Sequence, residues 1–202
     1  MKLYYAQKSP FVRKALVVAF EAGVEDKFDK IDCSTTTPIK PDAAIANPLK
    51  KLPALELDDG TTLFNSPVVC EYLDAELGNG TIFPSDPPAR WTALRFQALA
   101  DGLLDAAVLL RYENTLRPED LRWDDWASGQ MAKIDGALAD FEAHATSFGD
   151  RVDVGTISVA CALAYLDFRY ANKDWRATRP NLATWFATFA ERPSMKATQP
   201  PD

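Results

Sequence analysis

The sequence predicts a small α/β domain followed by an all-helical domain, and three observations support this. The first 77 residues alternate short apolar runs with helical patterns, in the order β-α-β-α-β-β-α. Residues 78–88 contain two glycines and three prolines, which is typical of a linker. Beyond that segment no convincing strand pattern occurs, and all five tryptophans lie there. We therefore place the two domains at residues 1–77 and 89–202.

Each element of the first domain has a local signal. Residues 2–6 are rich in aromatic side chains and predict a strand, after which Ser9-Pro10 opens a helix that ends near Gly23. A second strand over residues 27–32 is expected to pair in parallel with the first, because a helix connects them. Asp59-Gly60 is a hairpin turn. The remaining expected elements are a short helix over 42–46, strands over 54–57 and 61–64, and a helix over 66–77.

The second domain is predicted to contain four helices, over residues 89–114, 119–146, 154–170 and 182–191. Asp153 is the expected N-cap of the third helix, where its charge suits the positive helix end. That helix is apolar on nearly all sides until Asp167. We therefore expect it to be the core of the domain rather than a ligand site.

Composition argues against several classes of function. The net charge is −7, which disfavours a nucleic-acid-binding surface. Cys33, Cys70 and Cys161 form no CxxC pair and are expected to be reduced thiols of a cytoplasmic protein. The single histidine, His144, removes most histidine-based metal sites, so no metal is expected. The polar first residues predict no signal peptide, and the uncharged run 154–166 is too short for a membrane span.

The first Ser-Pro helix start is the candidate site of sulfur chemistry. In the thioredoxin-type architecture a reactive cysteine occupies this corner, because the helix N-terminus stabilises a thiolate. Here Ser9-Pro10-Phe11-Val12 stands in its place, so dithiol exchange at this corner is excluded. A serine hydroxyl can instead donate a hydrogen bond to the thiolate of a ligand and lower the pKa of that thiol. The simpler alternative is that Ser9 only caps the helix.

Two features further along the chain indicate a peptide-like ligand. Leu52-Pro53 precedes a strand, and a cis bond there would turn the Leu52 backbone outward to pair with a peptide. A trans proline at a strand start is the alternative. Ser66 is expected to cap the following helix, where a carboxylate fits, and Asn65 can donate to the same anion. Helix capping alone is again the alternative.

Lys50 and Lys51, which precede Leu52, are either a solvated face or the partners of a second carboxylate. Together these positions describe one ligand. A thiol would lie near Ser9, a peptide backbone against Leu52, and carboxylates near Ser66 and Lys51. That arrangement is the outline of glutathione.

Four segments carry a family resemblance: SPFVRKALVVAFEAG (Ser9–Gly23), NPLKKLPALELDDG (Asn47–Gly60), FNSPVVCEYLD (Phe64–Asp74) and VDVGTISVACALAYLDFR (Val152–Arg169). With them the chain resembles a cytosolic glutathione transferase over essentially its full length, and it looks most like the bacterial members with an SPFVRK opening. The two middle segments are specific for the N-terminal domain of that family, and the last is similar to its folding-core helix.

The resemblance implies an α/β thioredoxin-like N-terminal domain followed by an all-α C-terminal domain, usually as a homodimer. It implies that glutathione is the co-substrate, that Leu52-Pro53 is a cis step and that Ser66 binds the γ-glutamyl carboxylate. Ser9 matches the activating position. The implied glutathione-binding residues are Lys51, Leu52, Pro53, Asn65 and Ser66.

The sequence departs from the family pattern at two places. Asn65 stands where Glu or Gln is more usual, which shortens the contact with the γ-glutamyl amine. The box that opens the core helix usually reads Ser/Thr-x-x-Asp, whereas here it is Asp153-x-x-Thr156.

The electrophile pocket is expected between the two domains. One wall is expected to contain Tyr5, Lys8 and Phe11 from the first loop and the first helix, and the other Arg111, Tyr112 and Leu116 from the first long helix. The alternative for Tyr112 is packing within the helical domain. Asp101 is expected to be a solvated helix carboxylate rather than to reach the glutathione amine of a partner subunit.

We therefore expect an enzyme that transfers the thiolate of glutathione to an electrophilic small molecule, with Ser9 as the catalytic residue. A second copy of the chain is expected as a partner in a homodimer, whereas nucleic acid and membrane are not expected. One alternative is a non-catalytic protein that binds glutathione or apolar ligands. Another is a glutathione-dependent disulfide reductase or peroxidase, for which Cys33 could supply a thiol, although burial of that thiol is expected.

Overall fold

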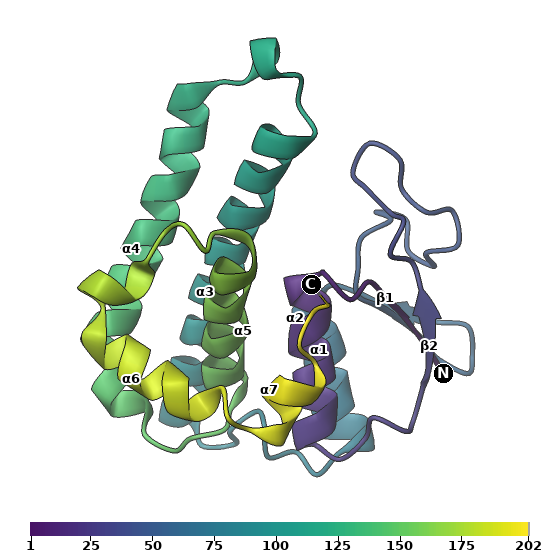
Figure 1. Ribbon diagram of the computed structural model, residues 1–202. Helices are drawn as coiled ribbons and strands as arrows, with labels where there is room; N and C mark the ends of the chain where they lie inside the picture. Colours follow the sequence, from purple (N-terminus) through teal and green to yellow (C-terminus); the bar gives the residue numbers. More distant parts are fainter. Residues whose placement is uncertain (202) are drawn as a thin grey trace.

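The computed structural model describes residues 1–201 and confirms the predicted fold class (Figure 1). Four strands form one small mixed sheet in the order β2-β1-β3-β4. The first two strands are parallel, as the helix that connects them requires, and the other neighbouring pairs are antiparallel. The strands are β1 (Lys2–Tyr5), β2 (Asp29–Asp32), β3 (Ala54–Glu56) and β4 (Thr62–Leu63).

Two helices pack against each other beside this sheet (Figure 1). Helix α1 (Pro10–Glu21) begins with Ser9 as its N-cap and is followed by Gly23 at φ 69°, a left-handed conformation that glycine adopts without steric cost. Helix α2 (Ser66–Tyr72) continues into a π-helical turn, Leu73–Leu77. Their apolar faces belong to the same core as the fully buried Leu3 and Leu55 of the sheet.

Helices make up the rest of the chain. A long antiparallel pair, α3 (Pro87–Thr115) and α4 (Asp124–Phe148), stands beside the buried helix α5 (Val154–Arg169), which lies between α3 and α1 (Figure 1). Two shorter helices, α6 (Pro180–Phe189) and α7 (Pro193–Ala197), and the 3-10 turns Glu119–Leu121 and Trp175–Thr178 complete this part. No helix within residues 1–201 is long and apolar enough to cross a membrane.

The start of α5 confirms the expected cap. The Asp153 carboxylate accepts from the Thr156 amide at 2.9 Å, and the Thr156 hydroxyl accepts from the Asp153 amide at 3.0 Å. This is a reciprocal capping box with its two residue types exchanged. The helix behind it is buried through Leu163, as its apolar pattern predicts.

The predicted short helix over residues 42–46 is wrong, so the first part of the chain is β-α-β-β-β-α. The Asp42 carboxylate accepts from the Ala44 amide at 2.9 Å, and this local turn replaces the first helical hydrogen bonds. Lys50 adopts a positive φ of 52° and donates from Nζ to the carbonyls of Ala43 and Ile45. Those carbonyls are therefore satisfied by a side chain instead of by a helix.

Other element boundaries shift by a few residues. Helix α3 begins at Pro87, inside the predicted linker, and α4 begins at Asp124 after the separate 3-10 turn. Helix α7 was not predicted, since five residues are too few to give a periodic pattern. The division of the chain into domains at residues 78–88 stays a prediction.

Charged side chains connect α1 to the helical part. Lys14 is fully buried, and its Nζ contacts both carboxylate oxygens of Asp101 on α3 at 2.6 and 2.7 Å. Glu21 accepts two hydrogen bonds from Arg192, of 2.9 and 2.7 Å. Asp101 is therefore not the solvated carboxylate that we predicted, because α1 packs over it and supplies a buried cation.

Candidate functional site

Strand register brings three loops of distant sequence to one end of the sheet. Tyr4, near the end of β1, pairs with Ala54, the first residue of β3, so the loop that leads to Ser9 lies beside Pro53. Leu63, at the end of β4, pairs with Leu55, so the segment entering α2 leaves at the same end. The strand pairing thus gathers the predicted positions Ser9, Leu52 and Ser66 along one side of the first domain.

Ser9 is the N-cap of α1 and is half-buried. Its Oγ accepts from the Val12 amide at 3.4 Å, which is a long hydrogen bond. No acceptor for the Ser9 hydroxyl proton occurs among residues 1–201, so this O–H can donate to a ligand. Capping and donation are compatible, because a hydroxyl accepts through its lone pairs and donates through its proton.

The Leu52-Pro53 bond is cis, as the resemblance implied. The Leu52 N–H and C=O have no hydrogen-bond partner in the described part of the chain. Asn47 holds the preceding turn, since its side chain donates to the Lys51 carbonyl and accepts from the Leu49 amide. The backbone of Leu52 is therefore held in place with both polar groups available, as a peptide ligand requires.

Ser66 is not the helix cap that we predicted. Asn65 holds the N-cap position instead, and its side-chain oxygen accepts from the Ser66 amide at 2.6 Å. The bond between Phe64 and Asn65 is also cis, which the sequence did not indicate. Ser66 is the first helical residue, its side chain is fully buried, and its Oγ has no hydrogen-bond partner among residues 1–201.

The two lysines before Leu52 have different environments. Lys50 uses its ammonium group to bind the carbonyls of Ala43 and Ile45, so it serves the loop and is neither a solvated face nor a carboxylate partner. Lys51 is exposed and stays a candidate for a ligand carboxylate.

A hollow beside Ser9 lies between the two parts of the molecule. The first loop and α1 form one side with Gln7, Lys8, Ser9, Pro10 and Arg13, and α5 forms the other with Cys161, Ala164, Tyr165 and Phe168, next to Pro200. The last turns of α5 thus line a candidate site, although we predicted core for this helix. The sequence did contain a signal for this lining role, because the apolar pattern of the helix changes to an aromatic and charged run at Tyr165–Tyr170.

The predicted electrophile pocket is only partly gathered around this hollow. Lys8 lines it, whereas Tyr5, Phe11, Arg111, Tyr112 and Leu116 do not. Phe11 is half-buried and packs against the main core. Arg111 and Tyr112 are half-buried on α3, and burial raises the pKa of Tyr112 while Arg111 lowers it.

The end of α5 is held against α3 next to Arg111. The Tyr170 hydroxyl donates to the Ala107 carbonyl at 2.5 Å, one helical turn before Arg111. Burial raises the pKa of Tyr165 to about 12, although Arg169 and then Arg111 act in the opposite direction. Tyr165 therefore stays protonated at neutral pH and can donate a hydrogen bond but cannot act as a base.

None of the cysteine thiols fits the role of a nucleophile. Cys33, Cys70 and Cys161 are all buried and free. Burial raises the pKa of Cys70 to about 12 and that of Cys161 to about 11. The pKa of Cys33 is also raised, mainly by burial and secondly by the negative charge of Asp42. A thiolate at this site must therefore come from a ligand.

Comparison with known families agrees with this architecture. Residues 8–76 match the family described as glutathione S-transferase, N-terminal domain, and residues 124–188 match glutathione S-transferase, C-terminal domain. The chain is 32% identical over 206 residues to YibF of Escherichia coli K12, an uncharacterized GST-like protein, and the match covers 100% of this chain and 99% of YibF.

Solved structures give the same result. A glutathione transferase family member from Pseudomonas fluorescens Pf-5 with bound glutathione is 44% identical with a TM-score of 0.96, covering 100% of this chain and 99% of that one. A structure from the same organism with bound S-(propanoic acid)-glutathione is 42% identical with a TM-score of 0.91, covering 99% of each chain. The chain belongs to the glutathione S-transferase family.

Proposed function

We propose that this protein is a glutathione transferase that binds glutathione along Leu52 and Ser66 and adds its thiolate to an electrophilic small molecule. The observation that carries the proposal is the fully buried Ser66 hydroxyl without a partner. An unsatisfied buried hydroxyl is costly, and a ligand carboxylate would satisfy it. The relatives from Pseudomonas fluorescens, which hold glutathione and a glutathione conjugate, support the choice of ligand.

Glutathione fits the residues at this end of the sheet. Its cysteinyl backbone would pair with the free N–H and C=O of Leu52, and its γ-glutamyl carboxylate would accept from the Ser66 hydroxyl. The Ser66 amide is already bonded to Asn65, so a carboxylate could use it only after the Asn65 side chain rotates away. Asn65 would then be free to contact the γ-glutamyl amine. Lys51 is the candidate partner of the glycyl carboxylate.

Ser9 would stabilise the bound thiolate. The thiol proton leaves to solvent, and the Ser9 O–H donates a hydrogen bond to the sulfur, which lowers the pKa of the thiol. The partial positive charge at the start of α1 acts in the same direction. The thiolate then forms a bond from sulfur to the electrophilic carbon, and the displaced group leaves with its bonding electron pair.

The chain's own thiols disfavour the alternative of a reductase with a protein nucleophile, because all three are buried and their pKa values are raised. We further propose that the protein acts in the cytoplasm as a homodimer. Analytical ultracentrifugation would test the homodimer, with a monomer at assay concentration as the contrary result.

The mechanism is tested by titrating the thiol of bound glutathione through the ultraviolet absorbance of the thiolate. We expect an apparent pKa below that of free glutathione in the unchanged protein. Ser9→Ala should raise it by about one unit, because a hydrogen bond to a charged group contributes about 1.5–3 kcal/mol. Turnover should fall about tenfold while glutathione affinity changes little, and Ser9→Thr should restore both signals.

A panel of electrophiles, peroxides and mixed disulfides then tests the reaction class. Conjugation that depends on Ser9 supports the proposal. Glutathione binding without any turnover would favour the non-catalytic binding protein instead. An unshifted thiol pKa in the unchanged protein would remove Ser9 from the mechanism.

A further inference from the structure

Two arginines near the predicted electrophile pocket have no acidic partner. Arg111 on α3 and Arg169 at the end of α5 are half-buried, and neither lies within ion-pair distance of a carboxylate among residues 1–201. Arg13, Arg122 and Arg179 also lack a carboxylate partner there, but each donates to a backbone carbonyl. Six other arginines do pair with carboxylates, namely Arg90, Arg95, Arg117, Arg151, Arg176 and Arg192.

The fold brings these two guanidinium groups into one region. The hydrogen bond from the Tyr170 hydroxyl to the Ala107 carbonyl joins the residue after Arg169 to the turn before Arg111. Burial lowers the pKa of Arg169, and the charge of Arg111 lowers it further. Like charges close together in a half-buried region cost free energy, and an anion between them would remove that cost.

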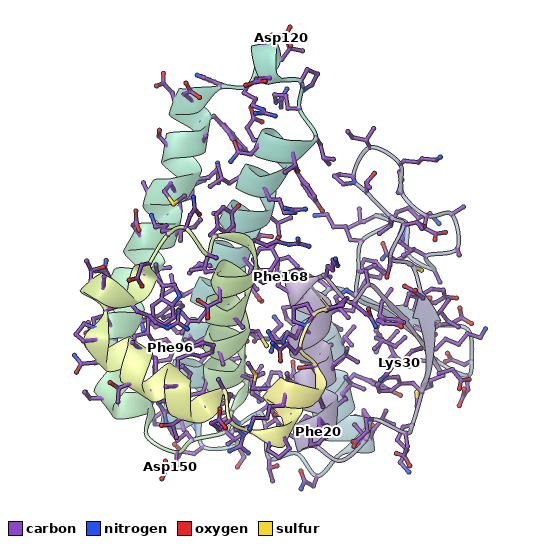
Figure 2. All side chains as sticks on the ribbon, in the orientation of Figure 1. Phe20, Lys30, Phe96, Asp120, Asp150 and Phe168 are labelled. Atoms are coloured by element: carbon purple, nitrogen blue, oxygen red, sulfur yellow. The ribbon has the colours of Figure 1, made fainter. Side chains whose placement is uncertain are left out.

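The region adjoins the hollow at Ser9. The guanidinium carbon of Arg169 lies 3.8 Å from the centre of the Phe168 ring, and Phe168 lines the hollow together with Ser9. Lys8 Nζ lies 5.9 Å from the centre of the same ring, so two positive charges lie near this aromatic side chain. Figure 2 shows Phe168 at the end of α5 that faces the start of α1.

One donor on Arg169 is unused. Its Nε atom is buried and has no hydrogen-bond partner in the described part of the chain. An arginine fork binds a planar carboxylate through two parallel hydrogen bonds, and this geometry favours a carboxylate over a neutral polar group. The aromatic side chain beneath the guanidinium suits a flat, unsaturated body next to the anion.

We propose that the electrophile of this protein carries a carboxylate, which Arg111 and Arg169 bind while its reactive carbon faces the sulfur near Ser9. This inference rests on the proposed function and names its substrate class. A suitable probe is a chloronitrobenzoate whose chlorine is para to the carboxylate and ortho to the nitro group. The glutathione sulfur bonds to the carbon that carries chlorine, chloride leaves with the bonding pair, and the thiol proton goes to solvent.

The test compares this benzoate with the matching benzamide, which has the same shape but no charge. Each enzymatic rate is divided by the spontaneous rate with glutathione, and the ratio of the two kcat/KM values measures selectivity. We expect the unchanged protein to favour the benzoate by about tenfold or more, and each of Arg111→Gln and Arg169→Gln to lower the ratio about tenfold. Arg95→Gln is the matched control on α3, because Arg95 pairs with Asp140 and should leave the ratio unchanged.

Calorimetry with the two S-aryl glutathione conjugates and with free glutathione gives a readout that needs no turnover. The charged conjugate should bind about tenfold more tightly than the neutral one, and the arginine substitutions should remove that difference. If the same substitutions weaken free glutathione equally, the arginines bind a carboxylate of glutathione itself and the inference is wrong.

The outcomes separate the two proposals. Conjugation of both probes without a preference for the benzoate overturns the inference and leaves the transferase proposal standing. Arginine-dependent binding of the charged conjugate without any conjugation contradicts the transferase proposal and overturns the assignment of an electrophile, leaving only a binding site for a carboxylate. Binding of neither glutathione nor either conjugate overturns both.

Discussion

The dipeptide Ser-Pro opens two helices of this protein, and its serine has a different position in each. At α1 Ser9 is the N-cap, half-exposed, with its hydroxyl accepting from the Val12 amide. At α2 the helix begins one residue earlier relative to the dipeptide, so Asn65 is the N-cap and Ser66 is the first helical residue. There the serine hydroxyl is fully buried and has no partner within residues 1–201.

A shift of one residue thus changes what each hydroxyl can do. Because Asn65 satisfies the first free amide of α2, the Ser66 hydroxyl is not needed for capping and has no partner within residues 1–201. Ser9 serves its own helix and keeps only its proton for a ligand. The pattern suits a binding role for Ser66 and a weaker, polarising role for Ser9.

The two helices also differ in how they are fixed. Helix α1 is connected to the helical part through the buried Lys14 and through Glu21, whereas α2 makes a more exposed ion pair, between Glu71 and Arg90. Helix α1 is therefore fixed by charged groups at two points, Lys14 in its first half and Glu21 at its end.

The largest expected effect tests this difference in anchoring. Asp101→Asn should lower the free energy of unfolding by about 3 kcal/mol, because it leaves the fully buried Lys14 without its anion. Glu71→Gln should cost less than about 1 kcal/mol, since its pair is half-exposed. Urea denaturation measures both, and equal costs would contradict the comparison.

The next effect concerns the unpaired hydroxyl. Ser66→Ala should weaken glutathione binding about tenfold, because a hydrogen bond to a carboxylate contributes about 1.5–3 kcal/mol. Stability should stay the same or rise, since the hydroxyl removed has no partner. Calorimetry and thermal unfolding give the two values, and a loss of stability with unchanged affinity would assign Ser66 a structural role.

Acid unfolding gives a third test of how α1 is fixed. Arg192 first, and then Ser194, lower the pKa of Glu21 from its ordinary value of 4.5, against the effect of burial. A lowered pKa stabilises the fold above that ordinary value and the contribution disappears as pH falls through the folded-state pKa.

Glu21→Gln should therefore cost about 1–2 kcal/mol near neutral pH and little in acid, where the carboxylate is protonated in both states. Urea unfolding at a series of pH values checks this expectation. A cost that does not depend on pH would show that the carboxylate charge is not what matters.

The smallest effect is expected at the other Ser-Pro helix start. Ser9→Ala should lower the free energy of unfolding by about 0.5–1 kcal/mol, because it removes an N-cap whose hydrogen bond is long. When the two single variants are compared by thermal unfolding, Ser9→Ala should destabilise the protein and Ser66→Ala should not. The reverse order would contradict the assignment of Asn65 as the cap of α2.

Local signals in the sequence determined much of this molecule. Ser9-Pro10 with Gly23, the Asp59-Gly60 turn and the box from Asp153 to Thr156 each act over a few residues, so the pattern alone locates the elements. The cis bond at Leu52-Pro53 was implied by the family resemblance and is present. The parallel pairing of β1 with β2 was also predicted, since a helix connects these two strands.

Tertiary structure decided the features that depend on contacts between distant residues. The Lys50 ammonium removes the helix expected at residues 42–46, the packing of α1 buries Asp101, and the end of α5 joins the wall of the hollow at Ser9. The Ser-Pro pattern also did not predict that Asn65, rather than Ser66, caps α2. The sequence thus identified the two serines that open α1 and α2. Only the tertiary structure decided which hydroxyl has no partner and which charged groups are paired, because burial and pairing arise between segments that are distant in the sequence.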